Sequence, residues 1–345
     1  MGNLRPVLIV GLVFLAYLMW IEWQKDYGPE PRPNPVENIA GDTPSQVTQD
    51  VPALDLPEAS AAEDLPQAPA APVSAGAPAS TVRSADEETI RVTTDVLDVR
   101  ISPVGGTVVS AVLRDYPVEL DRPETLVELL KTGPDRLFIA QSGLLSNQTA
   151  PNHTSRYQAE VSSYTLEPGQ GELRVPLSWT ADNGLEVTKT FVFSPGQYNI
   201  QVEHTMENRG GQAWVGSRYE QLQQSVPVDE EKAGFTNPGR YSFYGIGFYD
   251  PENKFEKIAF DDVADDPYRV TSERGWLAMI QHYFFAAWIP EPGEAATYTT
   301  QVIQNGDAPR FVARAVSPAI SLAAGATHRF NSILYIGPKL QDELP

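Results

Sequence analysis

The chain has 345 residues, enough for two domains of ordinary size, and its 45 acidic residues outnumber its 25 basic residues to leave a formal net charge of −20. So acidic a chain repels phosphate backbones, which excludes nucleic-acid binding as its main activity. It contains no cysteine, so disulfides, thiolate nucleophiles, zinc–thiolate sites and iron–sulfur clusters are excluded together.

The first expected element is a transmembrane helix within residues 1–26. The run Pro6–Ile21 carries no charge and would span about 24 Å as a helix, close to the hydrocarbon thickness of a bilayer. Arg5 precedes the run and acidic residues dominate after it, so the positive-inside rule places the N-terminus in the cytoplasm and the rest of the chain outside. A cleaved signal peptide is the alternative, but no small-residue cleavage site follows, and a lipid anchor has no cysteine to use. We expect a signal anchor that contacts the lipid bilayer through residues 6–21.

Residues 27–86 are expected to form a disordered linker. They hold eleven of the 30 prolines and one aromatic residue, Tyr27, so they cannot bury enough apolar surface to offset the entropy of ordering. A proline-rich docking motif is the alternative, but no basic P-x-x-P core supports it.

Residues 87–345 alternate between apolar and polar side chains, the period of half-buried β-strands. The clearest hairpin joins Leu173–Trp179 to Leu185–Phe193, and the alternation continues through Tyr198–Met206. Near the start, Gly105-Gly106 turns the chain after the strand Leu97–Ile101. Further strands are expected at Arg156–Leu166, Tyr241–Phe248, Thr297–Ile303, Arg310–Val316 and Asn331–Ile336. So many short strands predict a mainly β domain of two large antiparallel sheets packed face to face.

Few segments have helical spacing. They are Thr125–Lys131, Asp261–Val270 and the last residues from Pro338. The apolar stretch Trp276–Ile289 is too short to span a bilayer and ends at a proline, so we interpret it as one or two buried strands. The alternative is an amphipathic segment that dips into the membrane face.

No catalytic, cofactor or metal site is predicted. The four histidines, His153, His204, His282 and His328, lack metal-ligand spacing, and His204 is expected to be a hydrogen-bonded core residue on the apolar face of its strand. The acidic cluster Asp261–Asp266 lacks the glycine and distal glutamate of a calcium loop. A nucleophile elbow, a P-loop and a dinucleotide fingerprint are also absent from the sequence.

Several blocks along the chain share their order with a known protein family. The blocks are Trp20–Gln24, Val92–Ile101 with Gly105-Gly106, Asp115-Tyr116-Pro117, Ala140–Leu144, Thr188–Phe193, Gly275–Pro290 and Tyr335–Asp342. In this order they resemble the N-terminal portion of the YidC family of bacterial membrane protein insertases. The resemblance implies an inner-membrane anchor (1–26), a linker (27–86) and a periplasmic β-supersandwich domain (87–345) with a short helical end.

The resemblance also implies a function that is not enzymatic and needs no cofactor: the insertion and folding of inner-membrane proteins, alone or with the Sec translocon. The implied partners are the translocon, its accessory proteins and nascent inner-membrane proteins, in the inner membrane of a Gram-negative bacterium. By position, the accessory proteins would contact about residues 208–262. In the family, five transmembrane helices around a polar groove follow the periplasmic domain. This sequence has no second apolar run long enough to form a transmembrane helix. By the resemblance, the joint to such helices would be Gly337, Pro338, Lys339 and Leu340.

A second function remains open at this point, because supersandwiches resemble sugar mutarotases and carbohydrate-binding domains. Four aromatic residues, Tyr241, Tyr244, Phe248 and Tyr249, are suited to stacking on a sugar or to contacting a partner protein. They are the candidate partner-binding residues, and a binding screen against sugars would separate the two functions.

Overall fold

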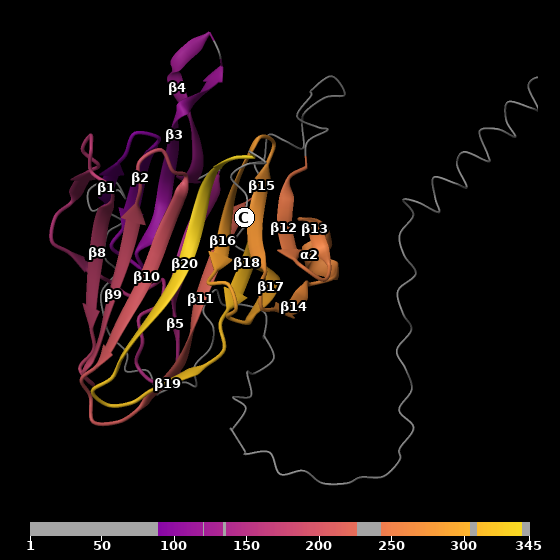
Figure 1. Cartoon of the computed structure of the whole chain (residues 1–345). Helices are drawn as coiled ribbons and strands as arrows, with labels where there is room; N and C mark the ends of the chain where they lie inside the picture. The colour runs from indigo at the N-terminus through magenta and orange to yellow at the C-terminus, as the bar shows by residue number, and fades with distance from the viewer. Residues whose placement is uncertain (1–88, 120, 134–135, 226–242, 304–308, 340–345) are drawn as a thin grey trace, which may run out of the picture. The chain divides into compact units, whose positions relative to one another are not determined.

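The computed structural model describes residues 89–119, 121–133, 136–225, 243–303 and 309–339 (Figure 1). These residues form twenty β-strands and one helical turn, α2 (Asp262–Asp265). The expected anchor and linker, the partner candidate Tyr241 and the joint residue Leu340 lie outside the described residues. Within those ranges, no helix is both long enough and apolar enough to cross a membrane.

The larger sheet has eleven strands. Its order is β14 (Arg269–Ser272), β17 (Ala296–Ile303), β18 (Arg310–Val316), β11 (Trp214–Ser225), β5 (Leu137–Leu145), β4 (Arg122–Thr132), β3 (Thr107–Glu119), β2 (Leu97–Ser102), β1 (Ile90–Thr93) and β7 (Ser163–Thr165), with β19 (Ile320–Leu322) paired to β11. All neighbours are antiparallel except β1 and β7, which run parallel.

The smaller sheet has nine strands, all antiparallel. Its order is β13 (Lys254–Ala259), β12 (Gly245–Asp250), β15 (Trp276–Gln281), β16 (Phe284–Pro290), β20 (Thr327–Pro338), β10 (Asn199–Asn208), β9 (Leu185–Phe193), β8 (Leu173–Thr180) and β6 (Gln158–Ala159).

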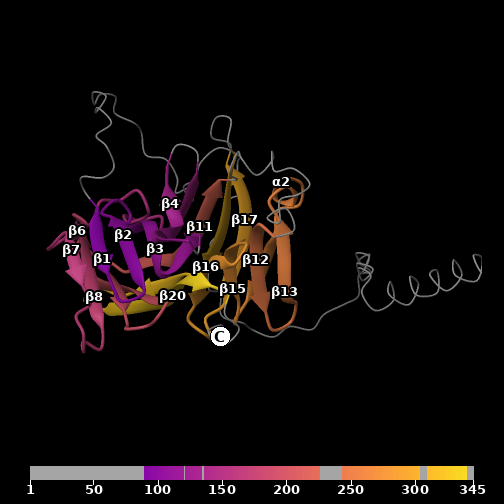
Figure 2. The same cartoon turned by 90° about the horizontal axis from the view of Figure 1, so that it is seen from above.

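The two sheets pack face to face, and Figure 2 shows them as two layers. Because side chains alternate between the faces of a strand, one face of each strand supplies the core. The main apolar cluster draws on both sheets, for example on Val99 and Leu222 of the larger sheet and on Val202 and Trp288 of the smaller one. The indole Nε1 of Trp288 donates to the backbone oxygen of Gln221 at 3.1 Å, which ties the layers together. A mainly β fold of two large sheets is therefore confirmed.

The apolar stretch Trp276–Ile289 forms two buried strands, as expected. These are β15 and β16, which pair with each other in the order Leu277↔Trp288 to Gln281↔Phe284. Only the turn between them, at His282-Tyr283, brings an aromatic ring into solvent. The alternative of an amphipathic segment is wrong for the strands themselves, because Phe285 and Trp288 are buried.

The expected helix at Thr125–Lys131 is wrong, because this segment lies within strand β4. Its pairing with β3 shifts between Ala111↔Leu130 and Val112↔Glu128, so that two residues of β4 face one residue of β3. This β-bulge leaves Leu129 and Leu130 both buried. A bulged strand can thus mimic the spacing of a helix, and the sequence pattern could not distinguish the two.

Other expected boundaries also shift. The helix expected at Asp261–Val270 is only the single turn Asp262–Asp265, because Pro267 follows it and strand β14 begins at Arg269. The strand expected at Arg156–Leu166 is broken into the short strands β6 and β7, and the strand expected at Tyr241–Phe248 begins at Gly245. The expected helical residues after Pro338 lie outside the described ranges, except Lys339, which is not helical.

Candidate functional site: a buried ionic layer between the sheets

Four ionisable side chains lie buried between the two sheets, and we call them the ionic layer: Lys189, His204, Arg218 and Glu220. They separate the main apolar cluster from a smaller one at the other end of the sandwich. On β9, Lys189 lies between Val187 of the smaller cluster and Phe191 of the main one; on β10, His204 lies between Met206 and Val202 in the same way. The layer therefore lies on the inward face of strands that are otherwise apolar there.

Lys189 is held by two backbone carbonyls, one in strand β5 of the opposite sheet and one in the turn between β2 and β3. Its Nζ donates to the oxygen of Gly105 at 2.6 Å and to the oxygen of Ser142 at 2.8 Å, and it lies 5.2 Å from the centre of the Tyr157 ring. Burial lowers the pKa of Lys189 to about 7, an effect that the negative charge of Glu220 opposes.

The turn Gly105-Gly106 makes room for this lysine. Both glycines have positive φ, and a Cβ on Gly106 would lie 2.8 Å from Cδ of Lys189. Any larger residue would therefore meet both backbone strain and the lysine side chain. The glycine pair was expected to form a turn, and it also supplies an acceptor to the buried amine.

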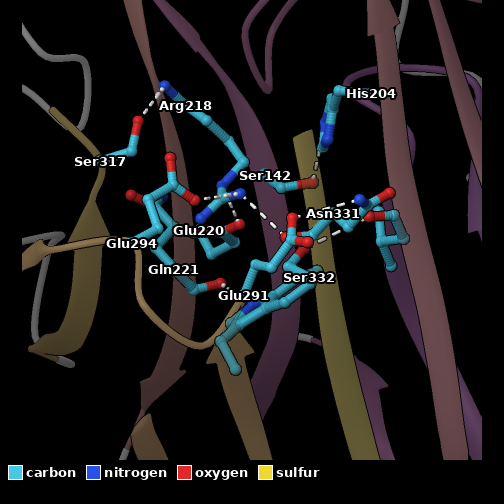
Figure 3. Close-up of polar contacts among 12 residues, drawn as sticks. Ser142, His204, Arg218, Glu220, Gln221, Glu291, Glu294, Ser317, Asn331 and Ser332 are labelled. Atoms are coloured by element: carbon cyan, nitrogen blue, oxygen red, sulfur yellow. Dashed lines mark hydrogen bonds and ion pairs between the residues drawn. The ribbon is translucent and has the colours of Figure 1, made fainter. Parts of the chain in front are cut away.

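Arg218 and Glu220 form a buried ion pair on the inward face of β11. The Nε of Arg218 lies 2.5 Å from Oε1 of Glu220, and its Nη1 lies 3.1 Å from Oε2 of Glu294, at the edge of the layer (Figure 3). Nη1 also donates to the oxygen of Asn331 in β20 at 2.9 Å, so the guanidinium links the two sheets. Burial raises the pKa of Glu220, while the Arg218 charge and the Ser332 hydroxyl oppose that rise.

His204 is a neutral member of the layer. Its pKa is well below the ordinary value because of burial and of the charges on Lys189 and Arg218. Its Nε2 lies 3.4 Å from Oγ of Ser142 (Figure 3), whereas Nδ1 is buried with no hydrogen-bond partner among the described residues. The core position predicted for His204 is confirmed, but only one of its two ring nitrogens is satisfied.

The layer lacks the access that catalysis would require. All four side chains are fully buried, so none of them is exposed to a substrate at the surface. In the part of the chain that the structure describes, no group of three or more metal-ligating side chains could hold a metal ion. Two hydrogen bonds of the layer join the sheets, from Lys189 Nζ to the oxygen of Ser142 and from Arg218 Nη1 to the oxygen of Asn331, whereas Arg218 Nη2 has no hydrogen-bond partner among the described residues.

An open groove of about 460 Å³ lies elsewhere, on the outer face of the smaller sheet. Amide and carboxyl side chains such as Gln201, Asn331 and Glu291 line it together with Ile289 and Ile333. None of its lining residues is aromatic. The carbohydrate hypothesis requires a sugar to stack on an aromatic ring. This groove has no aromatic side chain for such stacking.

The candidate partner-binding aromatics do not share one exposed surface. Phe248 is only 1% exposed, and its ring packs between Tyr268 and Tyr298 at centroid distances of 5.1 and 4.8 Å. Tyr249 points to the other face of the sheet and stacks on Trp276 at 5.7 Å. Tyr244 is half-buried against the main cluster. A partner contact through Tyr244 or Tyr249 stays a prediction, and the buried ring of Phe248 offers no surface to a partner.

The predicted joint is fastened to the turn between β15 and β16. Gly337 and Pro338 are the last buried residues of β20, and a Cβ on Gly337 would lie 2.9 Å from Tyr198. The backbone N of the exposed Lys339 donates to the oxygen of Tyr283 at 2.9 Å. The end of β20 is therefore held against a tight turn.

The ionic layer itself was missed from the sequence, although one signal pointed to it. Lys189 lies in phase with Leu185, Val187, Phe191 and Phe193, the apolar face of its strand. A charged residue at an inward position implies a buried partner. The partners could not be named, because Gly105 and Ser142 are distant in sequence.

Comparison with protein families gives a match to the YidC periplasmic domain over residues 89–345. The chain is 34% identical over 355 residues to the membrane protein insertase YidC of Thioalkalivibrio sulfidiphilus (strain HL-EbGR7), covering 100% of this chain and 60% of that protein. It is 37% identical over 351 residues to the membrane protein insertase YidC of Methylococcus capsulatus (strain ATCC 33009 / NCIMB 11132 / Bath), covering 100% and 59%. The chain thus spans about 60% of the length of these curated relatives.

Among solved structures, the similarity is weaker. A galactose mutarotase related enzyme from Lactobacillus acidophilus shares 8% identity at a TM-score of 0.45, over 73% of this chain and 100% of that one. A galactose mutarotase-like protein from Lactobacillus casei ATCC 334 shares 10% identity at a TM-score of 0.45, over 72% and 99%.

Proposed function

Because the chain belongs to the YidC family, we propose that it supplies the membrane anchor and the periplasmic domain of an insertase that aids the insertion and folding of inner-membrane proteins. The family is one of membrane protein insertases and not of enzymes. The observation that carries the proposal is the match over residues 89–345, which includes every described strand. In this proposal residues 1–26 anchor the chain, residues 27–86 are a linker and residues 87–345 are the periplasmic domain.

The partners in this proposal are the Sec translocon with its accessory proteins, and nascent inner-membrane proteins as clients. Two features of the described residues support a role in holding partners rather than in chemistry. The ionisable groups of the ionic layer are sealed from solvent, and the open groove offers amide and aliphatic side chains without an aromatic platform. Such a domain can position other proteins at the membrane while the chemistry of insertion takes place elsewhere.

Insertion itself should require more than this chain. Moving a polypeptide into lipid requires polar groups at membrane depth to shield its backbone, and Pro6–Ile21 offers none beyond Tyr17. We expect proteoliposomes with this chain alone to insert a small phage coat protein no better than empty liposomes. A chimera in which residues 87–345 replace the matching part of the full-length Methylococcus capsulatus relative should insert the coat protein, because the two chains are 37% identical over the whole of this chain. Insertion by this chain alone, or a folded but inactive chimera, would contradict the proposal.

The proposed orientation can be tested with single cysteines, because the chain has none of its own. In intact spheroplasts, a membrane-impermeant thiol reagent should label Ser80→Cys and leave Asn3→Cys unlabelled. The reason is the charge difference across the apolar run, with Arg5 on one side and acidic residues on the other. Permeabilised cells, in which both positions should react, are the control. The reverse pattern in intact spheroplasts would refute the orientation.

A further inference from the structure

Strands β3 and β4 continue past the larger sheet as a two-stranded ribbon. The pairing of β3 with β2 ends at Leu113, and β4 pairs with β5 only through Lys131 and Thr132. Beyond those residues β3 and β4 pair only with each other among the described strands, and Figure 1 shows them extending past their neighbours. We call residues 117–119 and 122–126 the ribbon. Because two strands alone are marginally stable in water, the ribbon requires support from elsewhere in the fold.

A bulge in β3 lies at the root of the ribbon. Leu113 is opposite Val127 and Pro117 is opposite Leu126, so residues 114–116 have no partner in β4. A bulge changes the direction of the side chains on the bulged strand. The three extra residues are therefore able to contact other parts of the domain.

Two of these residues reach the smaller sheet. Tyr116 packs edge-on against the ring of Phe284 at a centroid distance of 5.4 Å, and its ring lies 6.2 Å from that of Tyr198. The hydroxyl of Tyr198 donates to Oδ2 of Asp115 at 3.5 Å. Tyr198 is buried, and Tyr116 and Phe284 are half-buried against the main apolar cluster. We call the rings of Tyr116, Tyr198 and Phe284 the clasp.

The clasp also contacts the end of β20. We call residues 336–339 the exit, because the described part of the domain ends there. Phe284 is paired with the last residue of β20, and the backbone N of Ile336 donates to the oxygen of Tyr198 at 3.1 Å. A Cβ on Gly337 would lie 2.9 Å from the Cβ of Tyr198, so the strand passes directly against this tyrosine. The exit and the root of the ribbon therefore share the same aromatic contacts.

Three of the sequence blocks that carry the family resemblance meet at the clasp. Asp115-Tyr116-Pro117 supplies the root of the ribbon, Gly275–Pro290 supplies Phe284, and Tyr335–Asp342 contains the exit. The blocks are far apart in the sequence, and only the packing of the two sheets brings them together. At this point a change in the larger sheet can reach the end of the smaller sheet.

We propose that the clasp couples the ribbon to the exit, so that both open and close as one unit while the rest of the sandwich stays closed, and that Tyr116 is the positioning residue of this unit. Segments that share their contacts open together, with a free energy below that of global unfolding. A protein that binds the ribbon would thereby change the order of the exit, and the reverse also holds. The coupling does not depend on the proposed function; only the use of this unit as a joint rests on it.

Hydrogen exchange of the full chain in detergent micelles tests the coupling. In Tyr116→Ala the amides of the ribbon and those of Ile336 and Lys339 should exchange about tenfold faster, because the edge-on ring contact and its burial are lost. The amides of Val202 and Leu222 in the main cluster should keep their protection. Tyr116→Phe should exchange within about twofold of the unmodified chain, since the ring remains.

Two further variants complete the design. Tyr164→Ala removes another half-buried tyrosine, which packs against the main cluster from β7, and should leave the ribbon and the exit unchanged. Gly337→Ala disturbs the clasp from the other side, because the added Cβ pushes against Tyr198. The ribbon amides should then exchange faster as well, since coupling is reciprocal. Circular dichroism shows whether each variant is folded, and Gly337→Ala carries the test if Tyr116→Ala is not.

Several results would overturn the inference. One is faster exchange of the ribbon with an unchanged exit in Tyr116→Ala, and another is faster exchange of the exit with an unchanged ribbon in Gly337→Ala. A third is faster exchange throughout the domain in Tyr116→Ala, because the ring would then support the whole fold. A fourth is an equal effect of alanine and phenylalanine at position 116. Failure of the chimera to insert the coat protein would refute the proposed function and leave the coupling intact.

Discussion

Replacing Arg218 with alanine is expected to lower the free energy of unfolding by about 3–5 kcal/mol, because it leaves the carboxylate of Glu220 buried without its ion-pair partner. The substitution also removes the donor to the backbone oxygen of Asn331 and so one link between the sheets. Denaturant unfolding of the variant and the unmodified chain at pH 7 measures the difference. This loss of stability should become smaller below about pH 4.5. There Glu220 is protonated in both the folded and the unfolded variant, so that folding no longer buries a charged carboxylate.

The matched control removes both charges. In Arg218→Met with Glu220→Leu the apolar side chains fill similar volume, and buried ion pairs replaced in this way are often neutral or more stable. We expect the double variant to regain most of the stability lost by Arg218→Ala, with Glu294 remaining solvated because its side chain is 25% exposed. A double variant that is less stable than the single one would show that the pair stabilises the fold by itself. The buried-charge explanation would then fail.

The second large effect concerns Lys189 and pH. Its pKa is about 7 in the folded chain and 10.5 when exposed, so between these values the unfolded state binds a proton that the folded state does not. Stability must therefore rise as pH increases through this window, by about 2 kcal/mol between pH 7 and pH 9. Lys189→Met should remove this slope, as measured by denaturant unfolding at several pH values.

Other groups that face Lys189 do not produce the same slope. The pKa of His204 lies well below this range and that of Tyr157 well above it, because both are buried. Glu220 and Arg218 face the lysine from β11 and stay paired with each other. Lys131→Met, which removes a half-exposed lysine on β4, is the control and should keep the slope of the unmodified chain. An unchanged slope in Lys189→Met would show that this lysine does not titrate between the folded and unfolded states.

The alternation of apolar and polar residues along the chain was sufficient to predict the positions of most strands of this protein. The hairpin Leu173–Trp179 to Leu185–Phe193 corresponds closely to β8 and β9, and Arg310–Val316 is β18 without change. The reason is that alternation with period two is set by neighbouring residues alone whenever one face of a strand is buried. The family resemblance likewise depended on short local blocks, and the match over residues 89–345 confirms it.

Only the tertiary structure decided how those strands meet. The bulge at Leu129 depends on the register between β3 and β4, so a strand there had the spacing of a helix. Whether Phe248 or Tyr249 faces the core depends on which side the other sheet covers, which alternation does not reveal. The ionic layer is the clearest case, because Lys189 meets carbonyls 47 and 84 residues away. Side-chain period is a property of the local chain, whereas partners across two packed sheets are fixed only when both sheets have formed.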